Sequence, residues 1–210
     1  MKLLKYLLLA TLFISIFIPS GAQSKSKLFF REDWKEIEAA LPVTQEHVVN
    51  PDLVLSLYGP ASNEIKKSNH PNIPNDPYYI WSGECKSNWA LTLKHRIQKT
   101  DLTGDAKIKV RSKQSGFREL RIVLKLEDGS WLVSDQSAGV TEDWREVEFR
   151  IADIRWRKLN IETVIEGAWV QNPDLHKVEE IGFTDLMAGG GTPASSRLDW
   201  IEVFGAVSKL

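Results

Sequence analysis

The sequence predicts an all-β protein, a single β-sandwich of the jelly-roll type that follows a cleaved signal peptide. Apolar and polar residues alternate over several short segments, which is the two-residue period of a strand with one buried face. Turn signals separate these segments. No long amphipathic helix is evident, although a parallel α/β sheet would need such helices as crossovers. A closed β-barrel is the alternative architecture.

Residues 1–22 have the three regions of a secretory signal peptide. Lys2 and Lys5 precede the mostly apolar stretch Leu7–Ile18, and small residues follow at Ser20 and Ala22. Cleavage is expected after Ala22. The apolar stretch is shorter than the roughly 20 residues that span a bilayer. We therefore expect a secreted or periplasmic protein that has no membrane segment after cleavage.

The mature chain has the size of one domain, which we place at residues 28–207. Ser68–Pro77 contains three prolines and suits a long surface loop rather than a linker. Loss of Lys2 and Lys5 takes the formal net charge from −1 to −3, so neither sign dominates and nucleic acid is not an expected partner. Cys85 is the single cysteine, which excludes an intramolecular disulfide.

The first elements of the domain are predicted to be a short strand and a little helix. Leu28–Phe30 is predicted to be the strand. Glu32–Ala40 is predicted to form one or two helical turns, because Trp34, Ile37 and Leu41 would share one side.

Alternating strands then follow at Leu91–Lys94, Ala106–Arg111 and Leu120–Leu126. Asp128-Gly129 separates the last of these from Trp131–Val133. This dipeptide predicts a two-residue hairpin, because both central positions favour positive φ. The two strands that it joins are therefore expected to pair antiparallel.

The C-terminal half continues the pattern. Glu146–Ile151 alternates charged and apolar residues. Leu198–Phe204 is rich in β-branched and aromatic residues, as strands are. We expect this last run to close a sheet edge against the beginning of the domain.

Short motifs recur along the chain at Asp101–Gly104, Leu124–Trp131, Thr141–Glu146, Val178–Phe183 and Leu198–Val203. In their order they resemble the galactose-binding-like jelly rolls, the superfold of many non-catalytic carbohydrate-binding modules and of the complex I intermediate-associated protein type domain. The resemblance extends from about Trp81 to Gly205, and Thr44–Pro77 has no counterpart. It implies a jelly-roll sandwich with a carbohydrate ligand. Lectins, phospholipid binders and non-catalytic domains of enzymes share this fold.

Eight tryptophans lie in the mature domain. An indole offers a large apolar face and an N–H group, which suits a sugar that is apolar on one face and hydroxylated at its edges. The tryptophans within strand patterns are predicted to be core residues, namely Trp89, Trp131, Trp144 and Trp200. Trp169 is predicted to lie in a loop, and Tyr78, Tyr79 and Trp81 follow the proline-rich loop. For these four aromatic residues, ligand contact and packing are equally open.

Cations surround a tryptophan in the segment 155–158. Arg155 and its neighbour Arg157 would suit an acidic polysaccharide, because guanidinium groups pair bidentately with carboxylate or sulfate. A solvated strand face explains the same pattern and is preferred.

The glycine-rich segment 188–197 lacks the lysine of a phosphate-binding loop and precedes a strand, so nucleotide binding is not expected. Its glycines let the backbone approach another surface closely, including a ligand. Asp185 and Arg197 flank the segment. They are expected either to pair with each other or to face the binding site.

The resemblance also implies a structural calcium ion between the first and last strands. Glu32, Asp33 and Asp199 are the positions that match such a site. Asp199 shares a face with core residues, where a lone carboxylate needs a partner. Loop amides or a salt bridge to Arg197 or Arg31 would satisfy it equally well.

The primary hypothesis is an exported protein that recognises a glycan through loop aromatics, with Arg155 and Arg197 among its polar contacts. The alternative is a small exported glycoside hydrolase or polysaccharide lyase, which would need two suitably spaced carboxylates. Glu166, Asp174, Glu179 and Glu180 are available near Trp169, although glutamates before a strand are ordinary. No histidine motif, nucleophile elbow or triad assigns catalytic residues. A protein-binding domain, which would expose a large apolar patch, is the third hypothesis.

Overall fold

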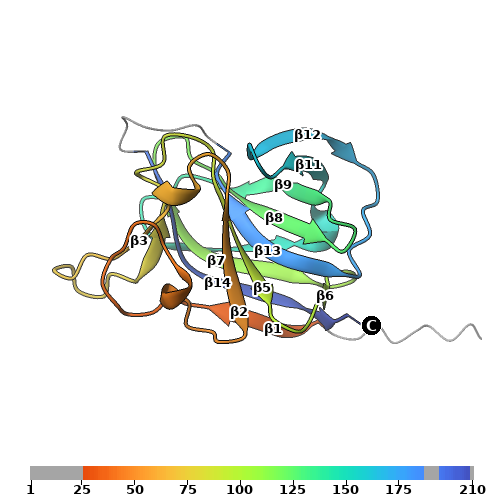
Figure 1. Ribbon diagram of the computed structural model, residues 1–210, viewed down its shortest axis with the longest axis horizontal. Coiled ribbons are helices and arrows are strands. Elements are labelled where there is room, and N and C mark those ends of the chain that lie inside the picture. The colour runs from red at the N-terminus through yellow and green to blue at the C-terminus, as the bar shows by residue number, and fades with distance from the viewer. Residues whose placement is uncertain (1–25, 187–193, 209–210) are drawn as a thin grey trace, which may run out of the picture.

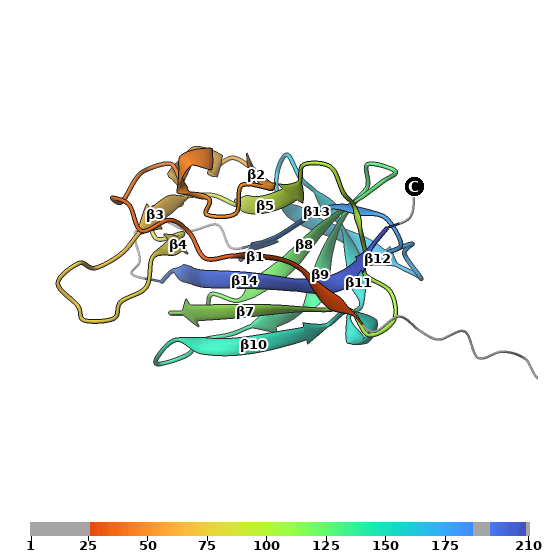
Figure 2. The ribbon, with the colours of Figure 1, turned by 90° about the horizontal axis from the view of Figure 1, so that it is seen from below.

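The protein is a sandwich of two antiparallel β-layers, and Figure 2 shows strands of one layer in front of strands of the other. The computed structural model describes residues 26–186 and 194–208. The predicted signal peptide and most of the glycine-rich segment lie outside these ranges. Within them, no helix is long and apolar enough to cross a membrane.

The smaller layer is built from β1 (Lys27–Glu32), β3 (Lys66–Ser68), β4 (Tyr79–Trp81), β7 (Lys107–Gln114), β10 (Arg145–Arg150) and β14 (Ser196–Val207). The larger layer is built from β2 (Leu53–Tyr58), β5 (Ala90–His95), β6 (Thr100–Asp101), β8 (Leu120–Leu126), β9 (Trp131–Ala138), β11 (Trp156–Asn160), β12 (Ile165–Val170) and β13 (Val178–Thr184). Single-turn 3-10 helices occur at η1 (Gln45–His47), η2 (Ser62–Glu64) and η3 (Ile151–Asp153).

The strand order places the first and last strands side by side. In the smaller layer β10, β7, β14 and β1 are neighbours (Figure 2), and β4 also pairs with β14. In the larger layer the order is β2, β5, β13, β8, β9, β11 and β12 (Figure 1). The end of β14 pairs with β6, which also pairs with β13. The last strand therefore joins both layers.

The inner faces of the two layers form the core, as the alternation predicts. Ile108 and Val110 of β7 are buried, and so are Ile181 and Phe183 of β13 on the opposite layer. A second, smaller apolar cluster lies on the outer face of the larger layer, at Ala90, Val123, Val133, Leu159 and Val164. The β11–β12 hairpin supplies the last two of these residues. The hairpin therefore covers part of that outer face.

The predicted helical turns at Glu32–Ala40 do not form. Trp34 has a φ of +59° and buries its indole, whose Nε1–H donates to the Leu198 carbonyl at 3.2 Å. The Glu32 carboxylate accepts the Trp34 backbone N–H at 3.0 Å. Such side-chain bonds to nearby backbone compete with helix formation. Ile37 and Leu41 remain exposed.

Two further details differ from the sequence-based expectations. The β8–β9 hairpin forms, but its loop has three residues, because Leu126 N–H bonds to the Ser130 carbonyl and Gly129 has a φ of +84°. The run Leu198–Phe204 does pair with the first strand, but it lies inside the layer, between β1 and β7.

Two features of the larger layer were not predicted from the sequence. β2 lies within Thr44–Pro77, the region without a counterpart, and pairs with β5. Gly182 occupies the centre of β13, where β5 passes so closely that a Cβ atom would lie 1.9 Å from the Leu91 carbonyl oxygen. Only glycine fits at that position without a shift of the backbone.

Candidate functional site

The β11–β12 hairpin carries Trp169 at the edge of the larger layer. Trp169 lies within β12 and not in a loop, directly opposite Arg157 of β11. Arg157 is in turn opposite Val133 of β9. Directly paired residues project to the same face, so Trp169 and Arg157 lie on the outer face of the layer. The Trp169 side chain is 44% exposed.

Two guanidinium groups lie against the Trp169 ring. The Cζ atom of Arg155 is 4.7 Å from the ring centroid, and that of Arg157 is 4.8 Å away. Both distances are within the range of cation–π attraction. The indole is thus held in place while almost half of it stays open to solvent.

The two arginines are fixed by different partners. Arg155 lies just before β11, and its Nε–H donates to Asp135 Oδ2 at 2.9 Å. Its side chain is nevertheless 76% exposed. Arg157 donates from Nε to the Gly167 carbonyl at 2.8 Å and from Nη1 to Glu166 at 3.2 Å. Arg157 is therefore the more constrained of the pair.

The surface is hollowed beside Trp169. A depression of about 390 Å³ is lined by Arg155, Trp169, Gln171 and Asn172 together with apolar residues that include Ile151, Val170 and Leu175. Gln171 and Asn172 carry carboxamides, which both donate and accept hydrogen bonds. We refer to Arg155, Arg157, Trp169, Gln171 and Asn172 as the Trp169 site.

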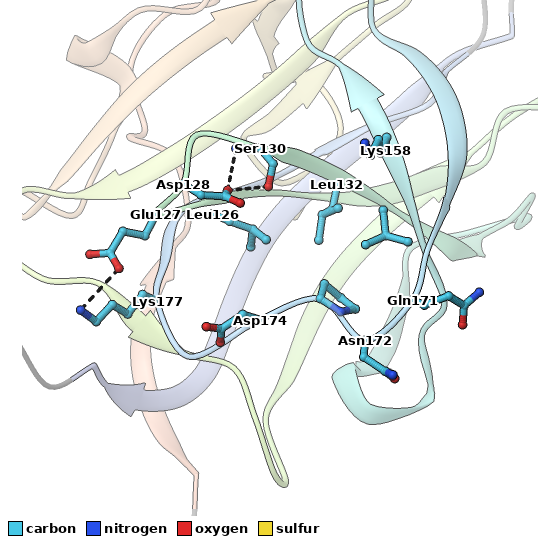
Figure 3. Close-up of a pocket in the computed structure, with 12 residues that line it drawn as sticks. Leu126, Glu127, Asp128, Ser130, Leu132, Lys158, Gln171, Asn172, Asp174 and Lys177 are labelled. Carbon is cyan, nitrogen blue, oxygen red and sulfur yellow. Dashed lines mark hydrogen bonds and ion pairs between the residues drawn. The ribbon is translucent and has the colours of Figure 1, made fainter.

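A second depression of about 390 Å³ lies on the other side of the segment Val170–Pro173 (Figure 3). Leu126 and Leu132 point into it, while Glu127, Asp128, Asp174 and Lys177 stand along one side. Gln171 and Asn172 lie at the opposite rim. The two depressions therefore share Gln171 and Asn172.

Solved structures similar to this chain include carbohydrate-binding modules. One is a family 11 module from Clostridium thermocellum in complex with a β-1,3-1,4-mixed-linked tetrasaccharide, with 15% identity, 83% of this chain and 100% of that chain covered, and a TM-score of 0.47. A family 29 module from Piromyces equi is 11% identical, and the match covers 84% of this chain and 91% of that chain with a TM-score of 0.44. An exo-β-agarase is 10% identical, and the match covers 74% of this chain and 23% of that chain with a TM-score of 0.42. No protein-family model and no curated protein matches the chain.

The other predicted aromatic residues lie together in the smaller layer and are largely packed. Tyr79 is 2% exposed, and its ring centroid is 5.3 Å from that of Trp144. Tyr78 and Trp81 are half-buried. Arg197 is paired with Trp81 across β14 and β4 and lies beside the Tyr79 hydroxyl. We refer to Tyr78, Tyr79, Trp81 and Arg197 as the Tyr79 group.

Lysine side chains cover the two half-buried rings of the Tyr79 group. The Lys67 ammonium is 4.0 Å from the Tyr78 ring centroid, and that of Lys66 is 5.4 Å from the Trp81 ring centroid. The ligand-binding residues that the sequence suggests are thus divided between two places, and Trp169 and Arg155 border an open depression.

The carboxylates suggested for calcium are bound by protein donors. Glu32 is fully buried and accepts backbone N–H groups of Trp34, Val49 and Asn50 at 2.7 to 3.0 Å. Burial raises the pKa of the Glu32 carboxyl despite these bonds. Backbone N–H groups directed at these oxygens leave little of them for a cation.

The other two suggested ligands are also paired, Asp33 with Arg31 at 2.6 Å and Asp199 with Arg111. Burial raises the pKa of the Asp199 carboxyl, and Arg111 opposes that shift. No group of three or more His, Cys, Asp or Glu side chains in the described ranges is arranged to hold a metal ion. Calcium binding at these positions stays a prediction.

Of the carboxylates suggested for catalysis, Glu166 and Asp174 have different surroundings. Glu166 lies on the outer face and binds Arg121 at 2.8 Å as well as Arg157. Asp174 lines the second depression, and its bonds to the backbone and ring of His176 lower the pKa of its carboxyl. A lowered pKa is unsuited to a general acid.

Cys85 and Asp185, which the sequence analysis also considered, are both buried. Cys85 is fully buried, which raises the pKa of its thiol to about 12 and makes it unreactive as a nucleophile. The Asp185 carboxylate is also buried and is bound by Arg118, Ser82 and Ser196.

Sequence reasoning named Glu180 only as an available carboxylate and missed the polar cluster around it on the same outer face. The Glu180 carboxylate, although buried, binds Tyr58 at 2.9 Å, Thr92 at 2.7 Å and Lys125 at 3.1 Å. The Tyr58 ring lies 5.0 Å from that of Trp131, edge to face. Tyr58 lies in the region without a counterpart, and only its two-residue spacing from Ser56 and Val54 in a strand would have indicated this face.

Sequence reasoning also missed the remaining members of the Trp169 site. Gln171 and Asn172 follow Val170 at the end of the strand that contains Trp169, while Arg157 was considered only with the cations around Trp156 and not as a neighbour of Trp169. Knowledge of the β11–β12 register is needed to bring all three beside Trp169.

Proposed function

We propose that the protein binds a carbohydrate at the Trp169 site. The observation that supports this proposal is an indole, 44% exposed, on an edge strand beside a polar-rimmed depression. The C–H face of a pyranose ring is apolar and its edges carry hydroxyls, so it matches an indole surrounded by hydrogen-bonding groups. Binding without chemistry is the simplest use of such a surface.

The polar groups of the site suit hydroxyl recognition. Gln171 and Asn172 present carboxamide donors and acceptors at the rim, and a sugar hydroxyl acts as both donor and acceptor. The second depression begins beyond the same two residues (Figure 3). A chain of sugar units would therefore extend from Trp169 across Gln171 and Asn172 rather than end at the indole.

Export is part of the proposal. The N-terminal residues have the pattern of a secretory signal, and a glycan ligand would be met outside the cytoplasm. Detection of the processed protein, with its N-terminus near Gln23, in the medium or periplasm of an expressing cell would test export separately from binding.

Titration with a panel of oligosaccharides and polysaccharides tests the binding proposal, with calorimetry or tryptophan fluorescence as the readout. Trp169→Ala is expected to abolish any response that the native protein gives. Phe117→Ala is the matched control, because Phe117 is an exposed aromatic residue in the loop after β7. A glycan response that survives Trp169→Ala would place the binding site elsewhere, and no response from a folded protein would contradict the proposal.

A further inference from the structure

We infer that the ligand of the Trp169 site is an acidic glycan whose carboxylate or sulfate group is bound by Arg155. This inference rests on the proposed function, because it names the class of carbohydrate that the same site would take. It follows from how the guanidinium of Arg155 is held.

The guanidinium of Arg155 already makes two contacts within the protein, one through its Nε–H group and one with the Trp169 ring. Its Nε–H donates to Asp135, whose other oxygen accepts the Arg155 backbone N–H at 2.9 Å. Its planar group lies against the Trp169 ring, with 4.7 Å between Cζ and the ring centroid. Within the described ranges, no protein acceptor binds its Nη1 and Nη2 atoms.

The free edge of Arg155 is therefore ordered but unbound. Nη1 and Nη2 present parallel N–H donors, a geometry that matches the two oxygens of a carboxylate or a sulfate. Because Asp135 and the Trp169 ring fix the orientation of the group, little side-chain entropy would be lost when an anion binds. With the side chain 76% exposed, an incoming anion reaches this edge without displacing protein.

The local charge balance favours an anion. Arg155 and Arg157 contact the ring, and their carboxylate partners are Asp135 and Glu166. A third arginine, Arg121, also binds Glu166. Glu166 is shared between Arg121 and Arg157. The site therefore keeps one more positive than negative charge, and the guanidinium with free donors lies beside the exposed indole where a sugar ring would stack.

The cations of the smaller layer contrast with this arrangement. The Lys107 ammonium forms an ion pair with Glu148 at 2.9 Å, and Nη1 of Arg111 forms one with Asp199. Arg150 matches Arg155 in exposure, at 73%, but it pairs weakly with Glu148 at 3.4 Å and no aromatic ring lies against it in the part of the chain that the structure describes. Arg150 thus provides a control that has the same charge and exposure without the indole.

The test compares glycans that differ only in their acidic groups. Polygalacturonate is paired with its carboxyl-reduced product, and dextran sulfate with dextran, so that carboxylate and sulfate are examined separately. We expect at least one acidic member to bind at least about tenfold more tightly than its neutral partner, as one charge-assisted pair would give. Arg155→Ala should remove that advantage, Arg155→Lys should restore only part of it, and Arg150→Ala should leave it unchanged.

The outcomes separate this inference from the proposed function. If neutral and acidic members bind equally through Trp169, or if Arg155→Ala has no effect on the acidic member, the inference is wrong and the proposed function stands. If none of these four glycans binds, the inference is wrong, and the wider panel decides the proposed function. If Trp169→Ala leaves the binding of every glycan unchanged, both are wrong. A preference that disappears equally in Arg150→Ala would be a general charge effect and would overturn the inference.

Discussion

The Trp169 site and the Tyr79 group contain similar residues, yet they have opposite environments. Both combine aromatic rings with cations at the end of a strand. In the Tyr79 group the rings are covered by Trp144, Lys66 and Lys67, whereas Trp169 has cations beside it and an open depression at its rim. Composition alone does not distinguish a binding surface from packing, because the distinction depends on which neighbours cover the ring.

The largest change in the free energy of unfolding should come from truncation of Tyr79, the buried ring of the Tyr79 group. Tyr79→Ala should lower the free energy of unfolding by about 3 to 5 kcal/mol, because it removes a buried ring and leaves a cavity beside Trp144. Trp169→Ala should lower it by less than about 1 kcal/mol, as for an exposed residue. Urea unfolding of both variants measures the difference, and equal losses would mean that Trp169 also serves mainly to stabilise the fold.

A pH-dependent effect should separate the two regions next. Burial lowers the pKa of Lys67, beside Tyr78, from 10.5 to about 8. Between these values the unfolded chain binds more protons than the folded one, so the free energy of unfolding rises with pH, by up to about 1.4 kcal/mol per pH unit. Below about pH 8 this contribution is constant.

Lys67→Met isolates this contribution from other groups that titrate at alkaline pH, including Tyr79, whose pKa is raised by burial. The variant should lack the rise that the native protein shows relative to it between about pH 8 and 10.5. Parallel pH profiles for the two proteins would mean that Lys67 is not desolvated.

The smallest effect is expected at the exposed region. Glu166→Gln should change the free energy of unfolding by less than about 1 kcal/mol, because its bonds to Arg121 and Arg157 lie near the surface. Urea unfolding checks this value. A loss of several kcal/mol would show that the ion pairs at the Trp169 site are needed to hold the β11–β12 hairpin on the layer.

The strands were predictable where one face is buried and the other is exposed to solvent. The alternation at Ala106–Arg111 and Leu120–Leu126 identifies β7 and β8, because side chains point alternately to core and solvent. Glu32–Ala40 was misassigned because a buried carboxylate and the positive φ of Trp34 determine its path. Such tertiary partners leave no local periodicity.

The candidate site was predictable only in part, for the same reason. Trp169 and Arg155 were recognisable as an aromatic and a cation in polar surroundings. Gly167 and the Asn172-Pro173 pair suggested a loop, but Gly167 lies at an irregularity in the β11–β12 pairing and its carbonyl holds Arg157. The register that places Arg157 opposite Trp169 depends on pairing between strands, which the sequence does not state.

The position of β14 has a consequence for how the chain becomes ordered. It lies between β1 and β7, whose edges stay unpaired until residues 196–207 are available. A nascent polypeptide would thus expose one open edge on each of these two strands until that segment has been synthesised. β7 and β10 can pair earlier, but the complete smaller layer forms only after residues 196–207 have been made, as in other folds in which distant parts of the chain pair.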